Sequence, residues 1–429
     1  MTAPKTTIVL ILMAGDSGTT NQIDALLWEF QEGMNNWSDG DPPEVICFYY
    51  RMIEIRHRIE TYRFHLQSKT LSFLPTEMLD EKVYPPTNPS AFAKELHGPI
   101  NIQIENFLKY VNSRLPNEGP IRLVIGAHGY FSVGINPWLR WLTFRWLFGG
   151  LIDKILRYFL PSSRRLIVPL DLVSTKSPPG GIALDSRHSH RKNPPSLYFD
   201  DLSKAFHELP RMRLKTLVLH TCVLSCIEAI VAFRLFPHQI ACETLLYDVM
   251  PFQVWFSTFA DPMATASEVT DGCFNSLTAS AKAGEIFSSL ATPCIDDLLD
   301  GIDELGTLLN HQLSHNRQPT IAIIKAAYIQ SQLNSYQVDI AQFCISLKSS
   351  LPGSAVLLDS IVAALRLHQL HSPVKTGSFS SPRYVPFQGV SIFLPESGAK
   401  QFAARDLPKS FLGRVRQWHV FLEHWQTIT

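Results

Sequence analysis

Short apolar runs that alternate with longer segments of helical period constrain the fold of this 429-residue chain more than any other feature. The runs are rich in β-branched residues, and the segments between them place apolar residues three and four positions apart. This alternation is typical of a mostly parallel sheet with helices packed on its faces. The sequence therefore predicts an α/β fold with six strands, at residues 6–14, 44–50, 121–128, 214–221, 239–244 and 389–394.

Helical period also predicts how the chain is divided. Crossover helices are expected at residues 24–32, 102–114, 200–209 and 223–235, and helical patterns dominate from about residue 296 onward. We expect an α/β domain over residues 1–295 and a mainly helical region over 296–429 that contributes the late strand at 389–394. Within the first part, residues 174–196 are rich in proline, serine and basic residues, a composition that predicts a loop without regular structure.

Composition limits the classes of function. Lysine plus arginine equals aspartate plus glutamate at 38 each, so no overall charge attracts nucleic acid. The seven cysteines show neither CxxC nor zinc-ligand spacing, which favours a reducing compartment with no structural metal. Residues 6–14 are interpreted as a strand and not as the core of a signal peptide, and no apolar run reaches the length of a membrane-spanning helix. We expect a cytoplasmic protein, with peripheral membrane contact left open.

Two predicted strands end in reactive side chains. The strand at 121–128 ends at His128, and the strand at 214–221 is followed at once by Cys222 and a predicted helix. Neighbouring parallel strands would bring both side chains to one cleft at the carboxyl edge of the sheet. A helix N-terminus favours a thiolate, and a nearby imidazole can take the thiol proton. The pair therefore predicts a nucleophilic Cys222 with His128 as its base. Taken alone, a buried cysteine and a core histidine would be the more ordinary interpretation.

Eight segments distinguish between these interpretations, because they resemble motifs of one enzyme family in the same order. They are Met13-Ala14-Gly15-Asp16 after the first strand; Asn101 with Phe107; His128-Gly129; Asp200-Asp201-Leu202 to Phe206; His220-Thr221-Cys222-Val223-Leu224 with Glu228; Cys242-Glu243; Val338-Asp339-Ile340 with Phe343; and Gly389-Val390-Ser391-Ile392-Phe393-Leu394-Pro395. Together they resemble the clostripain family of cysteine peptidases over most of the chain.

The resemblance implies a caspase-like three-layer αβα sandwich that cleaves peptide bonds. Cys222 would attack the carbonyl, His128 would protonate the leaving amine, and backbone N–H groups at Gly129 and Cys222 would stabilise the oxyanion. The substrate would be a protein or peptide, with no redox or nucleotide cofactor and no metal in the site. Relatives require calcium, but the chain shows no EF-hand spacing, so calcium stays open.

The chain departs from the family pattern at His220, where relatives carry an aspartate that selects arginine or lysine before the scissile bond. An imidazole cannot pair with a guanidinium as a carboxylate does, so basic specificity is not expected from this residue. Glu243 and Asp248 are the nearest acids that could line the pocket instead. The alternative is a catalytically inactive caspase-fold protein that binds a partner or a membrane. A hydrolase of another type would need a GxSxG elbow, which is absent.

Residues 131–197 form an insertion between the histidine and the cysteine. Its segment 138–165 mixes tryptophans and phenylalanines with arginines, so it could lie on a membrane surface, in a partner groove or on the chain's own core. Further on, Arg187, Arg191 and Lys192 stand in the basic loop, where internal cleavage could activate the protein.

Overall fold

The computed structural model describes most of the chain outside the insertion. The described residues are 4–14, 17–38, 42–53, 56–65, 70–73, 103–113, 115, 119–130, 181–183, 196–221, 224–243, 249–280, 286–292, 295–334, 336–351, 353–370, 374–375, 387–396 and 407–428. Residues 138–165, Arg187, Arg191, Lys192 and Asp248 lie outside these ranges, so what the sequence predicts for them stays a prediction.

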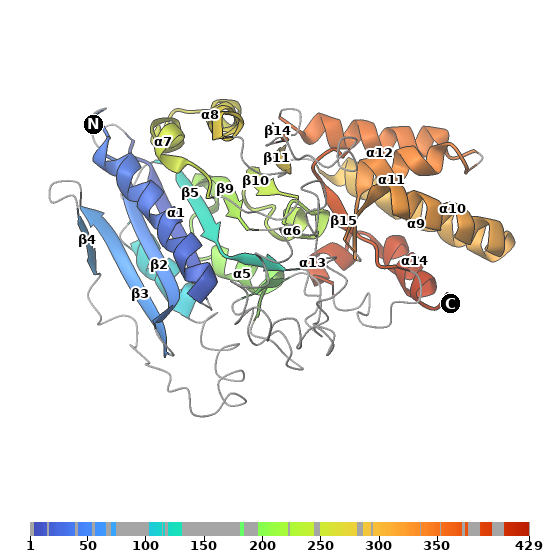
Figure 1. The fold of residues 1–429 in the computed structure, drawn as a ribbon, viewed down its shortest axis with the longest axis horizontal. Helices are drawn as coiled ribbons and strands as arrows, with labels where there is room; N and C mark the ends of the chain where they lie inside the picture. Colours follow the sequence, from blue (N-terminus) through green and yellow to red (C-terminus); the bar gives the residue numbers. More distant parts are fainter. Residues whose placement is uncertain are drawn as a thin grey trace, which may run out of the picture.

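A mostly parallel sheet forms the centre of the described chain (Figure 1). Its five parallel strands are, in spatial order, β10 (His238–Cys242), β9 (Leu214–His220), β5 (Ile121–Gly126), β1 (Thr7–Ala14) and β2 (Glu44–Ile53). All eight residues of β1 are buried, as expected of a strand covered on both faces. The predicted α/β class is confirmed, and five of the six predicted strands lie in this sheet.

The sixth strand of the sheet is not the one that the sequence predicted. Beside β10 the chain adds β11 (Ile286–Ala291), which is antiparallel, and then the short β14 (Val374–Lys375). Ser288 and Ser289 interrupt the apolar run of β11, and both are fully buried with hydrogen-bonded hydroxyls. At the opposite edge, β3 (Arg56–His65) and β4 (Thr70–Phe73) continue the sheet beyond β2 as antiparallel strands.

The late strand predicted at 389–394 lies in a separate small sheet. It forms β15 (Ser391–Phe393), which pairs with β13 (Gln337–Asp339), and β13 pairs with β12 (Gln332–Asn334). Placing it in the main sheet was wrong. A short buried run shows that a strand exists, but it does not show which neighbour offers free backbone groups.

Helices cover both faces of the main sheet. Ile8, Leu10 and Leu12 of β1 pack in one cluster with α1 (Ser17–Asn35), α7 (Phe252–Ala260) and α8 (Ala266–Ser280). Val9 and Ile11 pack in the other cluster with the helix at 103–113, with α5 (Phe199–Phe206) and with α6 (Ile227–Ala232). Alternate residues of one strand thus face opposite helical layers, which confirms the three-layer sandwich.

A buried arginine ties one helical layer to the sheet. Arg122, at the start of β5, is 1% exposed, and its guanidinium donates hydrogen bonds to the carbonyls of Thr258, Phe259 and Ala264. Burial lowers its pKa to about 10. The group therefore stays charged at neutral pH, and it fixes the C-terminal end of α7 against the amino end of β5.

The region after residue 295 is mainly helical and lies beyond β11, at the end of the molecule opposite β3 and β4 (Figure 1). Its helices are α9 (Asp296–His315), α10 (Arg317–Ser331), α11 (Ile340–Lys348), α12 (Ala355–His368), α13 (Lys409–Leu412) and α14 (Arg416–Gln426). Its apolar side chains belong to the same buried cluster as Leu219 of β9 and Ile227 of α6. The described part of the chain thus shares one continuous core across both regions.

A third, small sheet stands at the insertion. Here β6 (His128–Tyr130) pairs with β7 (Gly181–Ala183), and β7 pairs with β8 (Ser196–Tyr198). The expectation that residues 174–196 hold no regular structure was wrong for these residues. A strand in this position needs only backbone partners, which composition does not reveal.

Candidate active site

The carboxyl ends of β5 and β9 bring the two predicted reactive positions to one edge of the sheet. Gly126 of β5 is paired in register with His220 of β9, and the Ala127 N–H donates to the His220 carbonyl at 3.3 Å. His128 follows Gly126 by two residues, and Cys222 follows His220 by two residues. The histidine and the cysteine therefore follow matched positions on two adjacent parallel strands.

The structure describes these two positions only in part. The backbone of His128 opens β6 and is paired in register with Ala183, so β7 lies directly beside the histidine. The described chain reaches Thr221 and resumes at Leu224, so Cys222 itself lies outside it. The catalytic roles of Cys222 and His128, and the oxyanion role of Gly129, therefore stay predictions that rest on register and chain order.

His220 is a neutral side chain in this fold. It is 5% exposed, and desolvation lowers its pKa to about 3, so it carries no charge at neutral pH. Its Nδ1 atom and the hydroxyl of Thr221 find no hydrogen-bond partner among the described residues. Two buried polar groups next to Cys222 in the sequence thus lack a partner within the described part of the chain.

The helix after the cysteine starts later than predicted. The sequence places it at 223–235, directly after Cys222, but α6 spans only Ile227–Ala232, with Cys226 at its N-cap. Leu224 and Ser225 are not helical, because the Ser225 N–H donates to the Cys242 carbonyl of β10 at 2.9 Å. The expected stabilisation of a Cys222 thiolate by this helix N-terminus is therefore not supported.

Glu243 is fully buried just after β10, and its carboxyl group lies near that of Asp339. Burial raises the pKa of Asp339 to about 6, against backbone hydrogen bonds and an interaction with Glu243 that lower it. In this structure Glu243 thus contacts the C-terminal region, and its predicted role in a substrate pocket stays a prediction. The sequence held no signal for its pairing with Asp339, which lies 96 positions further along the chain (339 − 243).

Glu228 is a second fully buried carboxyl group near the candidate site, for which the sequence suggested no role. Its Oε1 atom accepts a hydrogen bond from the Phe393 N–H at 2.8 Å. Burial raises its pKa to about 7, offset in part by that hydrogen bond, its own backbone N–H and the Cys226 thiol. An acid in the first turn of an otherwise apolar helix is the signal that could have singled it out.

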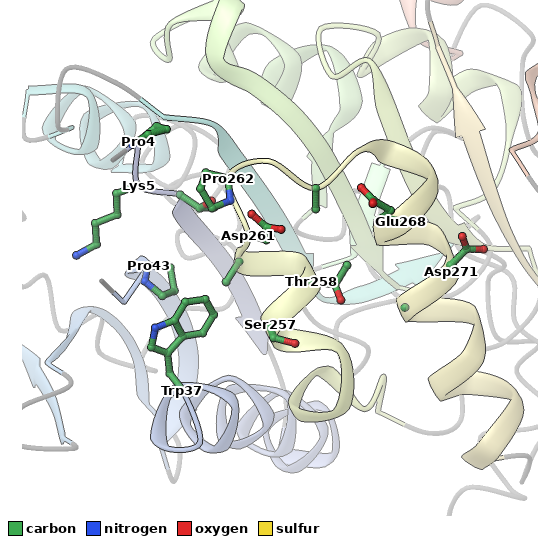
Figure 2. Close-up of a pocket in the computed structure, with 14 residues that line it drawn as sticks. Pro4, Lys5, Trp37, Pro43, Ser257, Thr258, Asp261, Pro262, Glu268 and Asp271 are labelled. Atoms are coloured by element: carbon green, nitrogen blue, oxygen red, sulfur yellow. The ribbon is translucent and has the colours of Figure 1, made fainter. Parts of the chain in front are cut away.

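A groove of about 800 Å³ lies at the other edge of the sheet, beside the amino ends of β1 and β2 (Figure 2). Lys5, Trp37, Asp261 and Glu268 are among its lining residues. Because this edge is opposite the carboxyl ends of the parallel strands, the groove is separate from the candidate site. Within the described ranges no cluster of three or more His, Cys, Asp or Glu side chains could hold a metal ion, and no helix there is long and apolar enough to span a membrane.

Comparison with known proteins identifies the fold. No family model and no curated protein match the chain. The X-ray structure of a secreted C11 cysteine protease from Bacteroides thetaiotaomicron, "iotapain", matches with a TM-score of 0.56 at 13% identity, covering 98% of this chain and 99% of that one. An inactive zymogen C11 protease from Parabacteroides distasonis matches with a TM-score of 0.53 at 13% identity, covering 100% of this chain and 99% of that one.

A third solved structure is a secreted C11 cysteine protease from B. thetaiotaomicron in complex with an irreversible peptide inhibitor. It matches with a TM-score of 0.55 at 12% identity, covering 98% of this chain and 99% of that one. Nearly the whole chain thus has the caspase-like fold of C11, or clostripain-like, cysteine proteases. The resemblance read from the eight sequence segments is confirmed at the level of the fold.

Proposed function

We propose that this protein is a cysteine peptidase of the clostripain type, which cleaves protein or peptide substrates with Cys222 as nucleophile and His128 as acid and base. The observation that carries the proposal is the register of β5 and β9, which sets both residues two positions beyond a paired position at one sheet edge. The fold shared with C11 proteases supports it.

The proposed reaction proceeds in two steps. The Cys222 thiolate attacks the substrate carbonyl carbon, the C–N bond breaks, and the imidazolium of His128 gives its proton to the leaving amine. Water then attacks the thioester, with His128 taking its proton, and the carboxylic acid leaves as the Cys222 thiol re-forms. Backbone N–H groups at Gly129 and Cys222 would stabilise the oxyanion in both steps. No cofactor takes part in this scheme.

The neutral state of His220 leads to a prediction about specificity. An aspartate at this position would hold a P1 arginine by a bidentate, charge-assisted pair contributing on the order of 1.5–3 kcal/mol, or roughly tenfold to a hundredfold in rate. An uncharged imidazole contributes little of this. We therefore expect wild-type protein to hydrolyse a library of fluorogenic peptides varied at P1 without strong preference for arginine or lysine.

In the same assay, His220→Asp is expected to raise hydrolysis of P1-arginine peptides relative to P1-leucine peptides by about tenfold. His220→Asn is the matched control, because it has the same size as aspartate and no charge, and it should leave the ratio near the wild-type value. A wild type that cleaves strictly after arginine would show that another acid fills the pocket. Glu243→Gln and Asp248→Asn would then be the variants to measure.

The other expectations from the sequence stay proposals. Contact of residues 138–165 with a membrane or a partner, activation by cleavage near Arg187, Arg191 or Lys192, a calcium requirement and a cytoplasmic location rest on the sequence alone. The rival function, a catalytically inactive scaffold, predicts no hydrolysis of any peptide in the library.

A further inference from the structure

Residues 388–393, which we call the strap, cross from the C-terminal region to the candidate active site. Two fully buried carboxyl groups hold its ends. At one end, Asp339 Oδ2 accepts hydrogen bonds from the Gln388 and Gly389 N–H groups at 2.5 and 3.2 Å. At the other end, Glu228 Oε1 accepts from the Phe393 N–H at 2.8 Å. A buried N–H group that loses its acceptor is left without a hydrogen bond, which costs stability, so these carboxyl oxygens hold both ends of the strap.

Ser225 holds the middle of the strap. The Ser391 N–H donates to the Ser225 carbonyl at 2.9 Å, and the Ser225 hydroxyl lies 2.6 Å from the Gly389 carbonyl oxygen. Gly389 adopts a φ of 86°, a conformation that favours glycine, and its carbonyl accepts from the hydroxyls of Ser225 and Ser288. On its other side, Ser225 is bonded through its N–H to β10. Ser225 is thus clamped between the main sheet and the strap.

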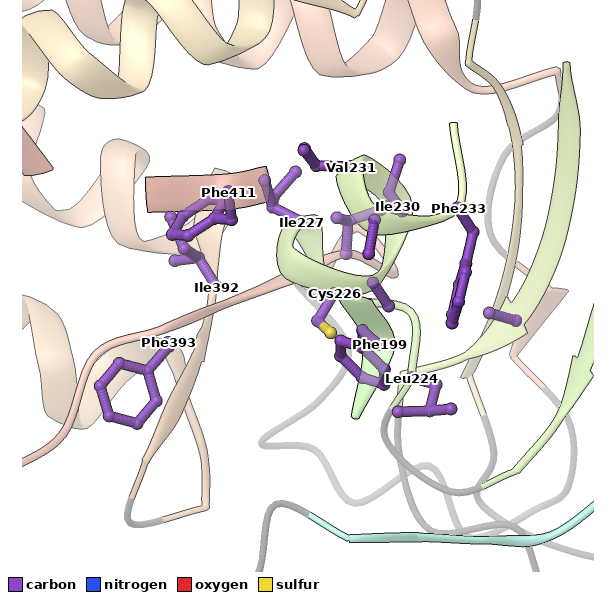
Figure 3. Close-up of a cluster of buried hydrophobic side chains, with 14 of the residues drawn as sticks. Phe199, Leu224, Cys226, Ile227, Ile230, Val231, Phe233, Ile392, Phe393 and Phe411 are labelled. Atoms are coloured by element: carbon purple, nitrogen blue, oxygen red, sulfur yellow. The ribbon is translucent and has the colours of Figure 1, made fainter. Parts of the chain in front are cut away.

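Apolar contacts extend this clamp to α6. Figure 3 shows Ile392 of the strap and Phe411 of α13 on the side of α6 that carries Ile227. All three side chains are fully buried in the same cluster. The start of α6 is therefore packed against the C-terminal region as well as bonded to it through Glu228.

The clamp lies close to the proposed nucleophile along the chain. Ser225 follows Cys222 by three residues, a stretch that can span at most about 10 Å even when fully extended. A Ser225 that is held in place therefore limits how far Cys222 can move, and a Ser225 that is released lets Cys222 move further. In enzyme sites, a misplacement of about 1 Å can lower the rate by roughly a hundredfold.

We propose that the strap positions the Cys222 loop for catalysis, with Ser225 and Glu228 as positioning residues that act through the loop. The inference rests on the proposed role of Cys222. It assigns a function to the C-terminal region, because the strap comes from that region and holds Ser225 on the side away from β10.

Four variants of the full-length protein test this proposal. Glu228→Ala removes the acceptor of the Phe393 N–H, and Glu228→Gln keeps an acceptor oxygen at the same place. Ser225→Ala removes the hydroxyl between the loop and the strap. Ser276→Ala is its matched control, since the Ser276 hydroxyl is also buried but donates to the Cys273 carbonyl within α8, at 2.7 Å. Circular dichroism would be used to check that each variant is folded.

The first readouts are kcat, KM and the rate at which iodoacetamide alkylates Cys222, located by peptide mass mapping. Glu228→Ala is expected to lower kcat and the alkylation rate by about tenfold or more with little change in KM, and Glu228→Gln to recover most of both. Ser225→Ala should lower them by about threefold to tenfold, while Ser276→Ala stays near wild type. Wild-type alkylation of Cys222 in folded Glu228→Ala, or equal losses in the two serine variants, would overturn the proposal.

Hydrogen exchange separates failure of the strap from failure of the proposed function. In Glu228→Ala the amides of residues 224–226 and 388–393 should exchange faster together, and in Glu228→Gln they should return toward wild type. If these segments respond together but wild-type protein hydrolyses no peptide, the proposed peptidase function is wrong and the clamp stands. If residues 224–226 keep wild-type exchange while the strap loosens, the clamp is wrong whatever the activity.

Discussion

Cys222→Ala is expected to lower peptide hydrolysis by about ten-thousandfold or more, to the limit of detection in a fluorogenic assay, because the thiol supplies the bond-forming atom. His128→Ala should cause a loss of similar size. Residues that act as one unit show non-additive effects, so the double variant should be no worse than either single one.

Cys226→Ala is the matched control for this prediction. Cys226 is fully buried at the N-cap of α6, and burial together with the neighbouring Glu228 carboxyl group raises the pKa of its thiol well above the ordinary value. Such a thiol is a packing residue and not a nucleophile. We expect Cys226→Ala to keep substantial activity. Substantial turnover by Cys222→Ala, or complete loss in a folded Cys226→Ala protein, would show that the nucleophile was chosen wrongly.

Glu228→Gln is expected to change the pH dependence of stability by about 3 kcal/mol between pH 4.5 and pH 8.5. The folded-state pKa of Glu228, about 7, lies above the ordinary value of 4.5, so the folded protein holds a proton that the unfolded chain has released. Wild-type stability from this group is therefore present below pH 4.5 and is lost as the pH rises through 7. Glutamine does not titrate, so it avoids this loss.

Urea unfolding of wild type and Glu228→Gln at both pH values measures this difference. His220 and His238, whose pKa values burial lowers to about 3, titrate in both proteins, so their contribution cancels in the comparison. Asp339 cancels in the same way. The thiol of Cys226, the titratable group that contacts Glu228, stays protonated over this range. A difference in stability that is the same at pH 4.5 and pH 8.5 would contradict the raised pKa of Glu228.

The central strands could be predicted from the sequence because burial on both faces leaves little freedom of composition. The strand expected at 6–14 is β1 at Thr7–Ala14, and the one expected at 214–221 is β9 at Leu214–His220. A continuous apolar, β-branched run between helical segments has few other stable placements. Because both strands could be predicted, the sequence also predicted that His128 and Cys222 follow strand ends at the carboxyl edge of the sheet.

The sequence-based predictions that were wrong concern segments whose structure depends on partners distant in the sequence. Residues 223–226 continue the apolar period of α6, so the sequence favoured one long helix, yet Ser225 is held by β10 and by the strap. Strand β11 was missed because two of its six positions are serines, whose polarity is offset by hydrogen bonds such as those between Ser289, His238 and Thr270. No local pattern reports such tertiary partners.

The site was predicted less completely than the fold. Motif order led to the prediction of Cys222 and His128 as a dyad, and residue type raised the question of specificity at His220. Whether that imidazole is charged depends on its burial, which only the fold determines. Likewise, Glu243 was considered for its charge, while its contact with Asp339 belongs to the packing of the C-terminal region against the sheet edge.

Site-resolved alkylation tests the central claim most directly. Full-length protein is treated with iodoacetamide at neutral pH, and the modification of each cysteine is followed over time by peptide mass mapping. Cys47, Cys226, Cys242, Cys273 and Cys344 are buried, so we expect Cys222 to react at least about tenfold faster than any of them, and His128→Ala to remove this advantage. A Cys222 that reacts no faster than the buried thiols, or that keeps its rate in His128→Ala, would contradict the assignment of the dyad.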